Sequence, residues 1–557
     1  MATDWKVLDA NGKVASSATL EAKVRHQKAL SAYRGASSGR LNSDWETSVG
    51  DADSTLIPER MGLIYRIRER LRNDPVMRGC LKKCVDSVIG PKGFNTQAQL
   101  DAKRLGLSEQ QARDLEREID YEWKSWQKEC DYSGNPARSF TFQSLLSLQF
   151  STELTCGETL TIPRYVRRPW ARFSFCIQPV APDRIVSPGG FWASFSGINN
   201  EDDIRDGIKI GRRGDIQGAY IARQHPGSYN WFRDVWKVDF IPAYSARTLK
   251  ANFWHNYQQY RVEATRGEPA FAACLLGFKS LGDYVSDEMS RAHMASMFGL
   301  SITREEAFDA DSEGLATADK IGSSDETDHA QVDMYPGMIN YLKPGESVSV
   351  VNPNIPGDQF DPFTDKIATW AGSSLGLSRE QILNTYNGMS FSSAKCSRDE
   401  AQRGFKKQQD DIVENYIEPV RERVIEEAWL RGRLVLPGFE DPEVRRNYFS
   451  HVTYAAPWPY LEPVKEETGV ELRLANGTSS LTRECSRAGH NLRDVIEERK
   501  REMQEFEAAG LPLPSYLREE PDPVLPGQGP DGAAATAEKK KMGRAERVAM
   551  ILQEKDE

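Results

Sequence analysis

The stretch that decides the fold is FDPFTDKIATWAGSSLGLSREQILNTYNGMSFSSAKCSRDEAQRGF at residues 360–405. Its first part predicts an amphipathic helix that ends at Gly376, because apolar residues recur on one face at helical spacing. The polar loop NTYNGMSFSS at 384–393 comes next, and a helix of about forty residues follows it. Glu418-Pro419 predicts a kink in that helix, since proline removes a backbone donor.

A longer helix precedes this stretch. TRGEPAFAACLLGFKSLGDYVSDEMSRAHMASMFGL at 265–300 predicts a helix from Pro269 to Gly299, with proline at the first helical position and glycine just past the end. About 29 residues at 1.5 Å each make a rod of roughly 43 Å. Its apolar face consists of Phe271, Leu275, Phe278, Leu281, Val285, Met289 and Ala292. Such a helix is more often a packing element than a cofactor site.

The amino-terminal half mixes helices and strands. Two helices meet at Pro75, where the tripeptide NDP interrupts a helical pattern of apolar residues. Helices near 108–130 and 141–155 follow, and then short strands such as ETLTIPRYV and FSFCIQPVAPDRIV. Residues 1–55 show no sustained period and predict a mobile arm, while the Pro- and Gly-rich stretch 511–535 predicts a linker. The predicted fold class is α+β.

Length and composition exclude several classes of protein. The 557 residues correspond to roughly three to four folded units of about 150 residues. A net charge of −10 argues against an affinity for nucleic acid or membrane that rests on bulk charge. The longest apolar stretch, FAACLLGF at 271–278, is too short to span a bilayer, so we expect no transmembrane helix. Eight scattered cysteines and no secretory pattern favour synthesis in a reducing cytoplasm.

Motifs for chemistry are weak. GASSG at 35–39 and GSSLG at 372–376 fit the hydrolase pattern G-x-S-x-G, but neither has the strand-then-helix setting that this pattern needs. GQGPDG at 527–532 lies in the linker without a preceding strand, and no G-x-x-x-x-G-K-[ST] phosphate loop occurs. We therefore expect no catalytic residue, no cofactor and no ATPase site.

Two clusters have open interpretations. Cys80 and Cys84 lie four residues apart on one predicted helix, which would be half of a metal site, but no second close pair of ligands occurs and we expect no metal. Between Arg60 and Lys92 there are nine basic residues and three acidic ones. This basic run is either a solvated helix face or a patch for phosphate or an acidic neighbour.

The order of these elements resembles the lambda-type portal protein family of tailed bacteriophages. Besides the two stretches quoted above, the resemblance rests on LRNDPVMRGCLKKCVDSVIGPKGF at 71–94, FTFQSLLSLQFSTELTCGETL at 140–160, IQPVAPDRI at 177–185 and PGMINYLKPGESVSVVNPNIP at 336–356. It covers most of residues 60–430 and is weaker before 55 and after 435.

The resemblance implies a portal fold that assembles as a ring of about twelve subunits. The implied parts are a mobile arm at 1–55, an α/β wing at 56–265, a first stem helix at 266–299, a clip at 300–359, a second stem helix at 360–378, a tunnel loop at 379–393, a long kinked helix at 394–432, the distal wing and helical crown at 433–510, and a linker and tail at 511–557.

The resemblance also implies a function. Double-stranded DNA would be packaged through the ring at a capsid vertex by a separate terminase and later ejected. The implied partners are other copies of the chain, the terminase large subunit, the major capsid and scaffolding proteins, and the head–tail connector proteins, with no membrane. The protein would be in the virion, after assembly in the host cytoplasm.

The implied site residues form two sets. Subunits would pack against one another through the stem residues Phe271, Phe278, Val285, Phe363, Ile367 and Trp370. The DNA would meet an uncharged tunnel loop, which includes Asn384, Thr385, Tyr386, Asn387, Gly388, Met389 and Ser390. Because a tube through which DNA slides should not grip it, the acidic balance and the uncharged loop both fit a conduit.

Two alternatives stay open. One is another head–tail connector or minor capsid protein that also forms a ring, although such adaptors are usually much shorter. The other is a cytoplasmic serine hydrolase that uses Ser37 or Ser374 as its nucleophile.

Overall fold

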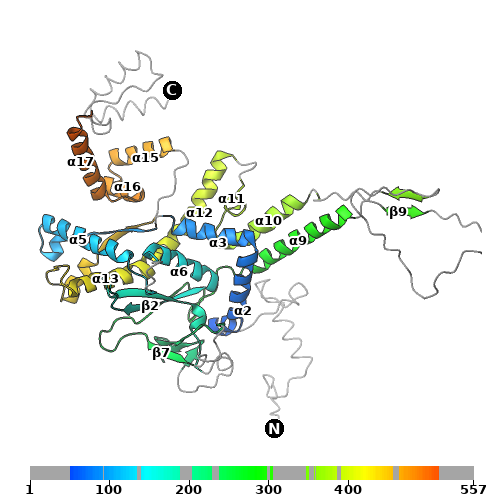
Figure 1. Cartoon of the computed structure of the whole chain (residues 1–557), viewed down its shortest axis with the longest axis horizontal. Coiled ribbons are helices and arrows are strands. Elements are labelled where there is room, and N and C mark those ends of the chain that lie inside the picture. The colour runs from blue at the N-terminus through cyan, green and yellow to red at the C-terminus, as the bar shows by residue number, and fades with distance from the viewer. Residues whose placement is uncertain are drawn as a thin grey trace, which may run out of the picture. The chain divides into compact units, whose positions relative to one another are not determined.

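The structure is a computed structural model, shown in Figure 1. It describes residues 50–91, 93–133, 140–188, 203–228, 237–297, 301–304, 346–349, 357, 359–385, 390–455 and 463–512. The chain divides into two compact units, the first of Met1–Lys92 with Ala98–Ser450 and the second of Gly93–Gln97 with His451–Glu557. The expected arm before Gly50 lies outside the described residues, as do most of the clip and the tail after 512. None of the described helices has the length and apolarity to cross a membrane.

The first unit begins with two helices that meet at Asp74-Pro75, as the sequence predicts. They are α2 (Ala52–Asn73) and α3 (Pro75–Val88). The Asp74 carboxylate accepts the N–H groups of Val76 and Met77 at 2.9 and 3.0 Å, and Pro75 has no N–H that needs a partner. The predicted end of the arm, residue 55, is wrong. Helix α2 already starts at Ala52, where the Asp51 carboxylate caps it by accepting the Ser54 N–H.

An aromatic core lies beside three further helices, α4 (Ala102–Leu105), α5 (Glu109–Gln127) and α6 (Phe142–Cys156). Trp123 and Trp126 of α5 are buried and stack with ring centroids 5.3 Å apart. Trp126 also stacks on Phe175 at 5.4 Å and donates its indole N–H to the Phe175 carbonyl at 3.0 Å. The indole is buried with its one donor satisfied, so this core binds α5 to strand β3.

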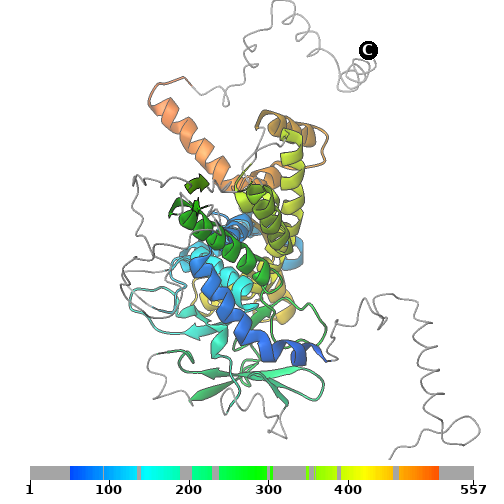
Figure 2. The same ribbon diagram turned by 90° about the vertical axis from the view of Figure 1, so that its right-hand side faces the viewer.

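Two antiparallel sheets form the rest of the α/β body. The first has the order β3-β2-β8, with strands at Phe175–Val180, Glu158–Tyr165 and Trp254–Tyr257. The second has the order β4-β5-β6-β7, with strands at Asp203–Arg205, Ile208–Ile210, Ile216–Ala222 and Val238–Pro242. Both views place α6 on one side of the first sheet and the second sheet on the other (Figures 1 and 2).

Strand β2 is covered on both faces, so its alternating side chains meet two different environments. Leu160 and Ile162 join an apolar cluster with Ile208 and Ile221 of the second sheet. On the opposite face, Thr161 bonds to Gln149 of α6. Because both faces of the strand are covered, all five side chains of ETLTI at 158–162 are buried, the threonines as well as the apolar residues.

A buried carboxylate at the start of β2 connects segments that are far apart in sequence. Glu158 accepts hydrogen bonds from Arg60 of α2 at 3.1 Å, from Arg266 Nε at 2.9 Å and from His255 Nε2 at 2.9 Å. Arg266 also reaches the Asp206 carboxylate at 2.6 Å. Burial favours a higher pKa for Glu158, but Arg266 and Arg60 outweigh it and hold the pKa well below its usual range. Glu158 is therefore ionised and bound on several sides.

The long helix begins later than its sequence predicts. Helix α9 is Leu275–Met297, whereas the expected start was Pro269. Tertiary contacts explain the difference: Ala270 N–H donates to the Leu154 carbonyl at 3.1 Å, and a Cβ on Gly267 would lie 2.0 Å from the Gly157 carbonyl oxygen. These contacts hold the segment against the end of α6, and only turns precede Leu275. The helix of 23 residues is about 34 Å long at 1.5 Å per residue.

The remaining elements of the first unit follow the predicted order. They are β9 (Ser301–Arg304) paired antiparallel with β10 (Glu346–Ser349), α10 (Phe360–Gly372), a 3-10 turn at Ser373–Leu375, α11 (Arg379–Leu383), α12 (Phe391–Ile412), a π-helical turn at Val413–Ile417, α13 (Glu418–Leu430) and α14 (Pro442–Tyr448). Gly376 has a positive φ of 70° and ends the α10 segment, as expected. The region expected to be a loop from 379 begins with the short helix α11, which a capping box at Ser378 and Gln381 starts.

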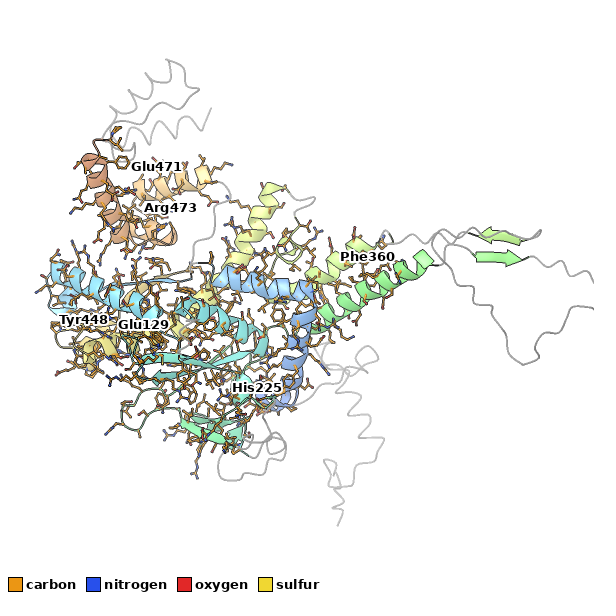
Figure 3. All side chains as sticks on the ribbon, in the orientation of Figure 1. Glu129, His225, Phe360, Tyr448, Glu471 and Arg473 are labelled. Carbon is orange, nitrogen blue, oxygen red and sulfur yellow. The ribbon has the colours of Figure 1, made fainter. Side chains whose placement is uncertain are left out.

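The second unit contains strands and helices. Strands β1 (Asn95–Ala98) and β11 (His451–Tyr454) pair, and helices α15 (Pro463–Ala475), α16 (Leu481–Arg487) and α17 (Leu492–Ala508) follow. Helices α16 and α17 are separate, because Gly489 adopts a φ of +80° between them. Arg473 of α15, labelled in Figure 3, binds Glu484 of α16 at 3.2 Å.

Glu158→Gln should destabilise the protein by about 3 kcal/mol or more, because it removes the fully buried one of the two carboxylates that Arg60 and Arg266 share, and leaves only Asp206 to balance two buried arginines. Urea unfolding of the full chain at neutral pH measures the effect. Asp239→Asn, in the exposed pair between Arg223 and Asp239, is the matched control and should leave the midpoint unchanged. Equal midpoints for Glu158→Gln and wild type would contradict a central role for Glu158.

Candidate functional site

Helices α9 and α10 pack side by side as a two-helix arm (Figure 1). Close approach is possible because Gly277 has no side chain: a Cβ there would lie 3.0 Å from the Cβ of Ala371. Toward the other end, the Tyr284 ring stacks on Phe360, which Figure 3 labels at the start of α10, with centroids 5.7 Å apart. Small residues at one end and aromatic rings at the other therefore fix the spacing of this arm.

The six residues expected to pack subunits together lie in different environments. Phe271 and Phe278 are fully buried inside the chain, so they belong to the core of one subunit and are not free to contact another. Val285 and Ile367 are half-buried. Phe363 is 47% exposed and Trp370 is 70% exposed. Burial of Phe278 follows from packing of α9 on the body of its own subunit, which an apolar stripe alone does not distinguish from a ring contact.

Two more exposed apolar side chains accompany Phe363 and Trp370 on the two-helix arm. Leu276 is 74% exposed and Met289 is 69% exposed. Met289 lies on the predicted apolar stripe, but Leu276 lies off it, so helical periodicity gave no signal for Leu276. We call Leu276, Met289, Phe363 and Trp370 the exposed apolar set.

Three arginines of the basic run, all on α2, bind carboxylates. Arg60 pairs with Glu158 at 3.1 Å, and Arg68 pairs with Asp183 at 2.6 Å. Arg70 reaches Asp283 of α9 at 3.4 Å. These three pairs attach α2 to the body and to the two-helix arm, so the phosphate-binding interpretation is wrong for these arginines.

The segment between α11 and α12 is described at its two ends. Asn384 ends α11 with a φ of 53°, a left-handed conformation that asparagine tolerates. Ser390 starts α12 by accepting the Ser393 N–H at 3.2 Å. Thr385 is half-buried, and the expected loop residues Tyr386, Asn387, Gly388 and Met389 lie outside the described residues. Both ends are therefore fixed by helix caps.

The long helix changes its geometry just before Glu418-Pro419. The π-helical turn Val413–Ile417 separates α12 from α13. Pro419 has no N–H, so it cannot bond the Asn415 carbonyl, and Asn256 of β8 donates its side-chain N–H to that carbonyl at 3.1 Å instead. Where the sequence predicts a kink, the structure has a π-helical turn, and an amide from a distant strand satisfies the freed carbonyl.

Tyr416 in this turn holds the long helix to the body. Its hydroxyl lies 2.5 Å from Thr159 Oγ1 of β2 and donates to Glu153 Oε2 of α6 at 2.8 Å. Burial raises the pKa of Glu153 to about 7, while the hydrogen bond from Tyr416 opposes the rise. Glu153 therefore changes its charge near neutral pH.

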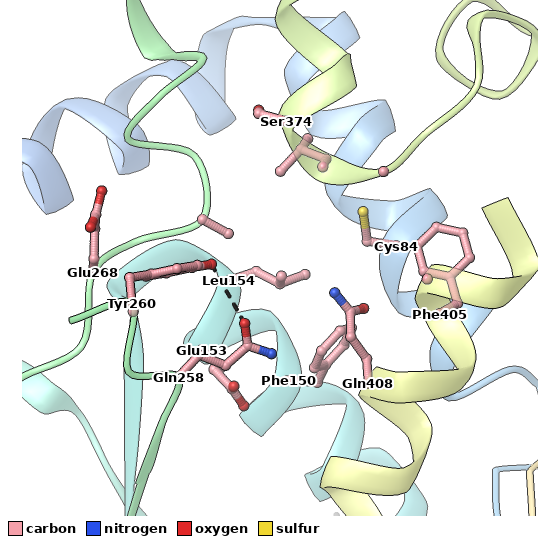
Figure 4. A pocket seen from close by; sticks show the side chains of 15 residues that line it. Cys84, Phe150, Glu153, Leu154, Gln258, Tyr260, Glu268, Ser374, Phe405 and Gln408 are labelled. Carbon is pink, nitrogen blue, oxygen red and sulfur yellow. Dashed lines mark hydrogen bonds between the residues drawn. The ribbon is translucent and has the colours of Figure 1, made fainter. Parts of the chain in front are cut away.

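Ser374 lies at a cavity of about 170 Å³ between α6, α12 and the turn after α10 (Figure 4). Its hydroxyl donates to the Ala371 carbonyl at 3.2 Å. No histidine is among the described residues that line the cavity, and α10 rather than a strand precedes the serine. This setting lacks the base and the strand that a serine nucleophile needs. Ser37 lies outside the described residues.

The cysteine pair on α3 is a packing feature. Cys80 and Cys84 are buried, and burial raises the pKa of both thiols to about 12. Protonated thiols are poor metal ligands. Across the described part of the chain, no group of three or more Cys, His, Asp or Glu is placed to hold a metal ion.

Comparison with known proteins places these features in a family. The family model for phage portal protein, lambda family, matches residues 38–409. The portal protein of Escherichia phage N15 is 21% identical over 491 residues, covering 85% of this chain and 89% of that protein. Portal protein B of Escherichia phage lambda is 22% identical over 508 residues, covering 87% and 91%. A chain from the neck of an empty gene transfer agent particle is 12% identical with a TM-score of 0.40, covering 78% and 94%.

The family match covers the α/β body, the two-helix arm and most of α12. The chain belongs to the lambda family of phage portal proteins. The resemblance in the sequence is thereby confirmed, and the protein is a component of a phage particle with a portal function.

Glu153→Gln should change how stability depends on pH. Since folding raises the Glu153 pKa from 4.5 to about 7, the folded protein binds the extra proton between these values and loses stability as the pH rises through them. The glutamine variant lacks this loss but can still accept the Tyr416 hydroxyl. Its urea midpoint relative to wild type should therefore be higher at pH 8 than at pH 4.5. A difference that is the same at both pH values would contradict the titration.

Proposed function

We propose that the chain forms a closed ring, of about twelve copies, at one vertex of the capsid. Double-stranded DNA would enter the head through this ring during packaging and leave through it later, and the head–tail connector proteins would attach to it. Family membership over residues 38–409 is the observation that carries this proposal. The ring would be in the virion, after assembly in the host cytoplasm with the major capsid and scaffolding proteins.

The exposed apolar set supports contacts between copies. Leu276 and Trp370 are each at least 70% exposed although both are large and apolar, and they lie on the helix pair whose other side is packed into the body. A single exposed leucine needs no explanation, but four such residues on one pair of helices favour contacts with other copies of the chain. Leu276 and Met289 lie on different sides of α9, and in a ring each copy contacts a neighbour on either side through two different surfaces, so that the ring closes.

The segment between α9 and α10 is proposed as the clip that binds the terminase large subunit and then the connector proteins. Its described part consists of β9 and β10, which pair in the register Glu346 with Arg304 and Ser349 with Ser301. Residues 300–335 are rich in Asp, Glu and Ser and poor in large apolar side chains, so a partner is expected to supply part of their packing.

The tunnel loop is proposed to touch the DNA. Residues 384–390 carry no charge, so they would rest against phosphate without the counterion-release attraction that Lys or Arg adds. Helix α12 follows the loop directly and is anchored by Tyr416, which gives the loop a fixed base. The net charge of −10 per copy agrees with a channel that does not grip its DNA.

Another head–tail connector or minor capsid ring protein is the alternative function. Family membership favours the portal. A packaging experiment would separate the two functions: we expect loss of a portal to keep DNA out of the head, and loss of a connector to let DNA enter without being retained. We do not propose a hydrolase, because the Ser374 setting described above lacks a base.

Trp370→Asp should convert rings to smaller species while the subunit stays folded, because Trp370 is exposed within the chain and its expected partner is another copy. Light scattering on a sizing column measures the mass. Asp287→Ala, at an exposed polar position of α9, is the control and should leave the ring mass unchanged. Phe278→Asp should instead unfold the subunit. A ring of unchanged mass for Trp370→Asp would contradict the proposed contact.

Deletion of residues 387–390 should leave rings intact but reduce the amount of DNA retained in heads. Met389→Lys should slow packaging, most strongly at low salt, because the added cation attracts phosphate. Met389→Gln has a similar length without the charge and should package at the wild-type rate. Packaging assays with purified heads and terminase give these rates. Equal rates for the lysine and glutamine variants at low salt would show that the loop does not touch DNA.

A further inference from the structure

An open groove of about 870 Å³ lies on the α/β body, apart from the two-helix arm and the tunnel loop. One wall is the hairpin that joins β5 to β6, from Ile210 to Gln217. The other wall is the end of β8 with the segment that follows it, including Tyr257 and Gln259. The groove is mainly polar and charged.

Two arginines of the groove have no counter-ion among the described residues. Arg212 and Arg213 are exposed at the tip of the hairpin, where Gly211 N–H bonds the Asp215 carbonyl at 2.7 Å and closes the turn. The third arginine of the groove, Arg205, is already paired with Asp203 at 3.2 Å and with Asp53 at 3.1 Å. The groove also has a carboxylate, Glu263, on its opposite wall. An acidic ligand would therefore bind at the hairpin side.

Gly50, the first residue that the structure describes, lies close to this groove. The Gly50 carbonyl accepts a hydrogen bond from Arg261 at 2.9 Å. The Asp51 carboxylate lies 3.9 Å from Arg205, which is itself a groove residue. The residues just before Gly50 thus start at the rim of the groove, and six of them can reach about 20 Å when extended.

The sequence of those residues complements the groove. Residues 44–49 are Asp-Trp-Glu-Thr-Ser-Val, with two carboxylates around one tryptophan. We propose that residues 44–49 dock in the groove of their own chain, with Asp44 and Glu46 on Arg212 and Arg213. Trp45 would cover the partly exposed apolar side chain of Ile216, which lines the same wall.

The short tether explains why this occupant is favoured over an external acidic peptide. A segment joined to the rim by a few residues has an effective concentration in the millimolar range, so even weak ion pairs hold it. The pairs are exposed, and salt should therefore weaken them. The inference does not depend on the ring, and it would stand if the proposed function failed.

Proteolysis tests the docking in the full chain. We expect a glutamate-specific protease to cut after Glu46 at least about five-fold faster in Arg212→Glu/Arg213→Glu than in wild type, and faster in wild type at 1 M salt than at 0.05 M, because screening releases the segment. Arg104→Glu/Arg117→Glu makes the same charge change at exposed arginines outside the groove and should cut at the wild-type rate. Equal rates in all three proteins would overturn the proposal.

A cysteine pair tests the occupant without changing any charge. Ser48→Cys with Gln217→Cys, in a background with Cys396 and Cys485 replaced by serine, should form a disulfide within one chain under mild oxidation. Crosslinks only between chains would overturn docking in the same chain. Binding of a short DNA duplex that is lost in Arg212→Glu/Arg213→Glu, with the cleavage rate after Glu46 unchanged, would assign the groove to phosphate and also overturn the proposal.

Discussion

The buried carboxylate of Glu158 is the constraint on which the rest of the first unit depends. Two arginines and a histidine from three other segments bind it: Arg60 of α2, Arg266 ahead of α9, and His255 of β8. A buried ion is costly unless its partners are complete, so the three segments must meet at the start of β2 for the unit to fold. Asp206 is a second carboxylate in this cluster and pairs with both Arg60 and Arg266.

The functional elements extend from this body. Arg266 lies nine residues before Leu275, where α9 begins, so the ionic cluster fixes the base of the two-helix arm. On the other side of β2, Thr159 is next to Glu158 and bonds Tyr416 in the π-helical turn. Two consecutive residues of β2 therefore hold both elements: Glu158 binds the segment before the two-helix arm, and Thr159 binds the π-helical turn of the long helix.

Much of the fold could be predicted from the sequence, because the signals are local. Asp74-Pro75 marked the break between α2 and α3, and Pro419 marked the interruption of the long helix. The start of α9 could not be predicted, because backbone contacts with Leu154 and Gly157 override the helical preference after Pro269. The same limit applies to Phe278: periodicity predicts an apolar face but not whether the same chain or a neighbour covers it.

The ionic cluster around Glu158 could not be predicted from the sequence either. Arg60 reads as one of nine basic residues in a run, and only the fold brings it to a glutamate 98 positions away. The family resemblance was stronger than any single motif, because it rested on segments in the right order over most of the chain, and the family match at 38–409 confirms it. The parts that the resemblance assigned to the clip and the tunnel loop remain proposals.

The central claim is that this chain closes into a ring with a passage for DNA. Electron microscopy of the purified full-length protein, with masses from native mass spectrometry, tests it most directly. The account predicts that end-on images show rings with a central hole wide enough for a DNA duplex. It also predicts a single mass that corresponds to about twelve subunits. Monomers at every concentration, or open filaments without closure, would contradict it.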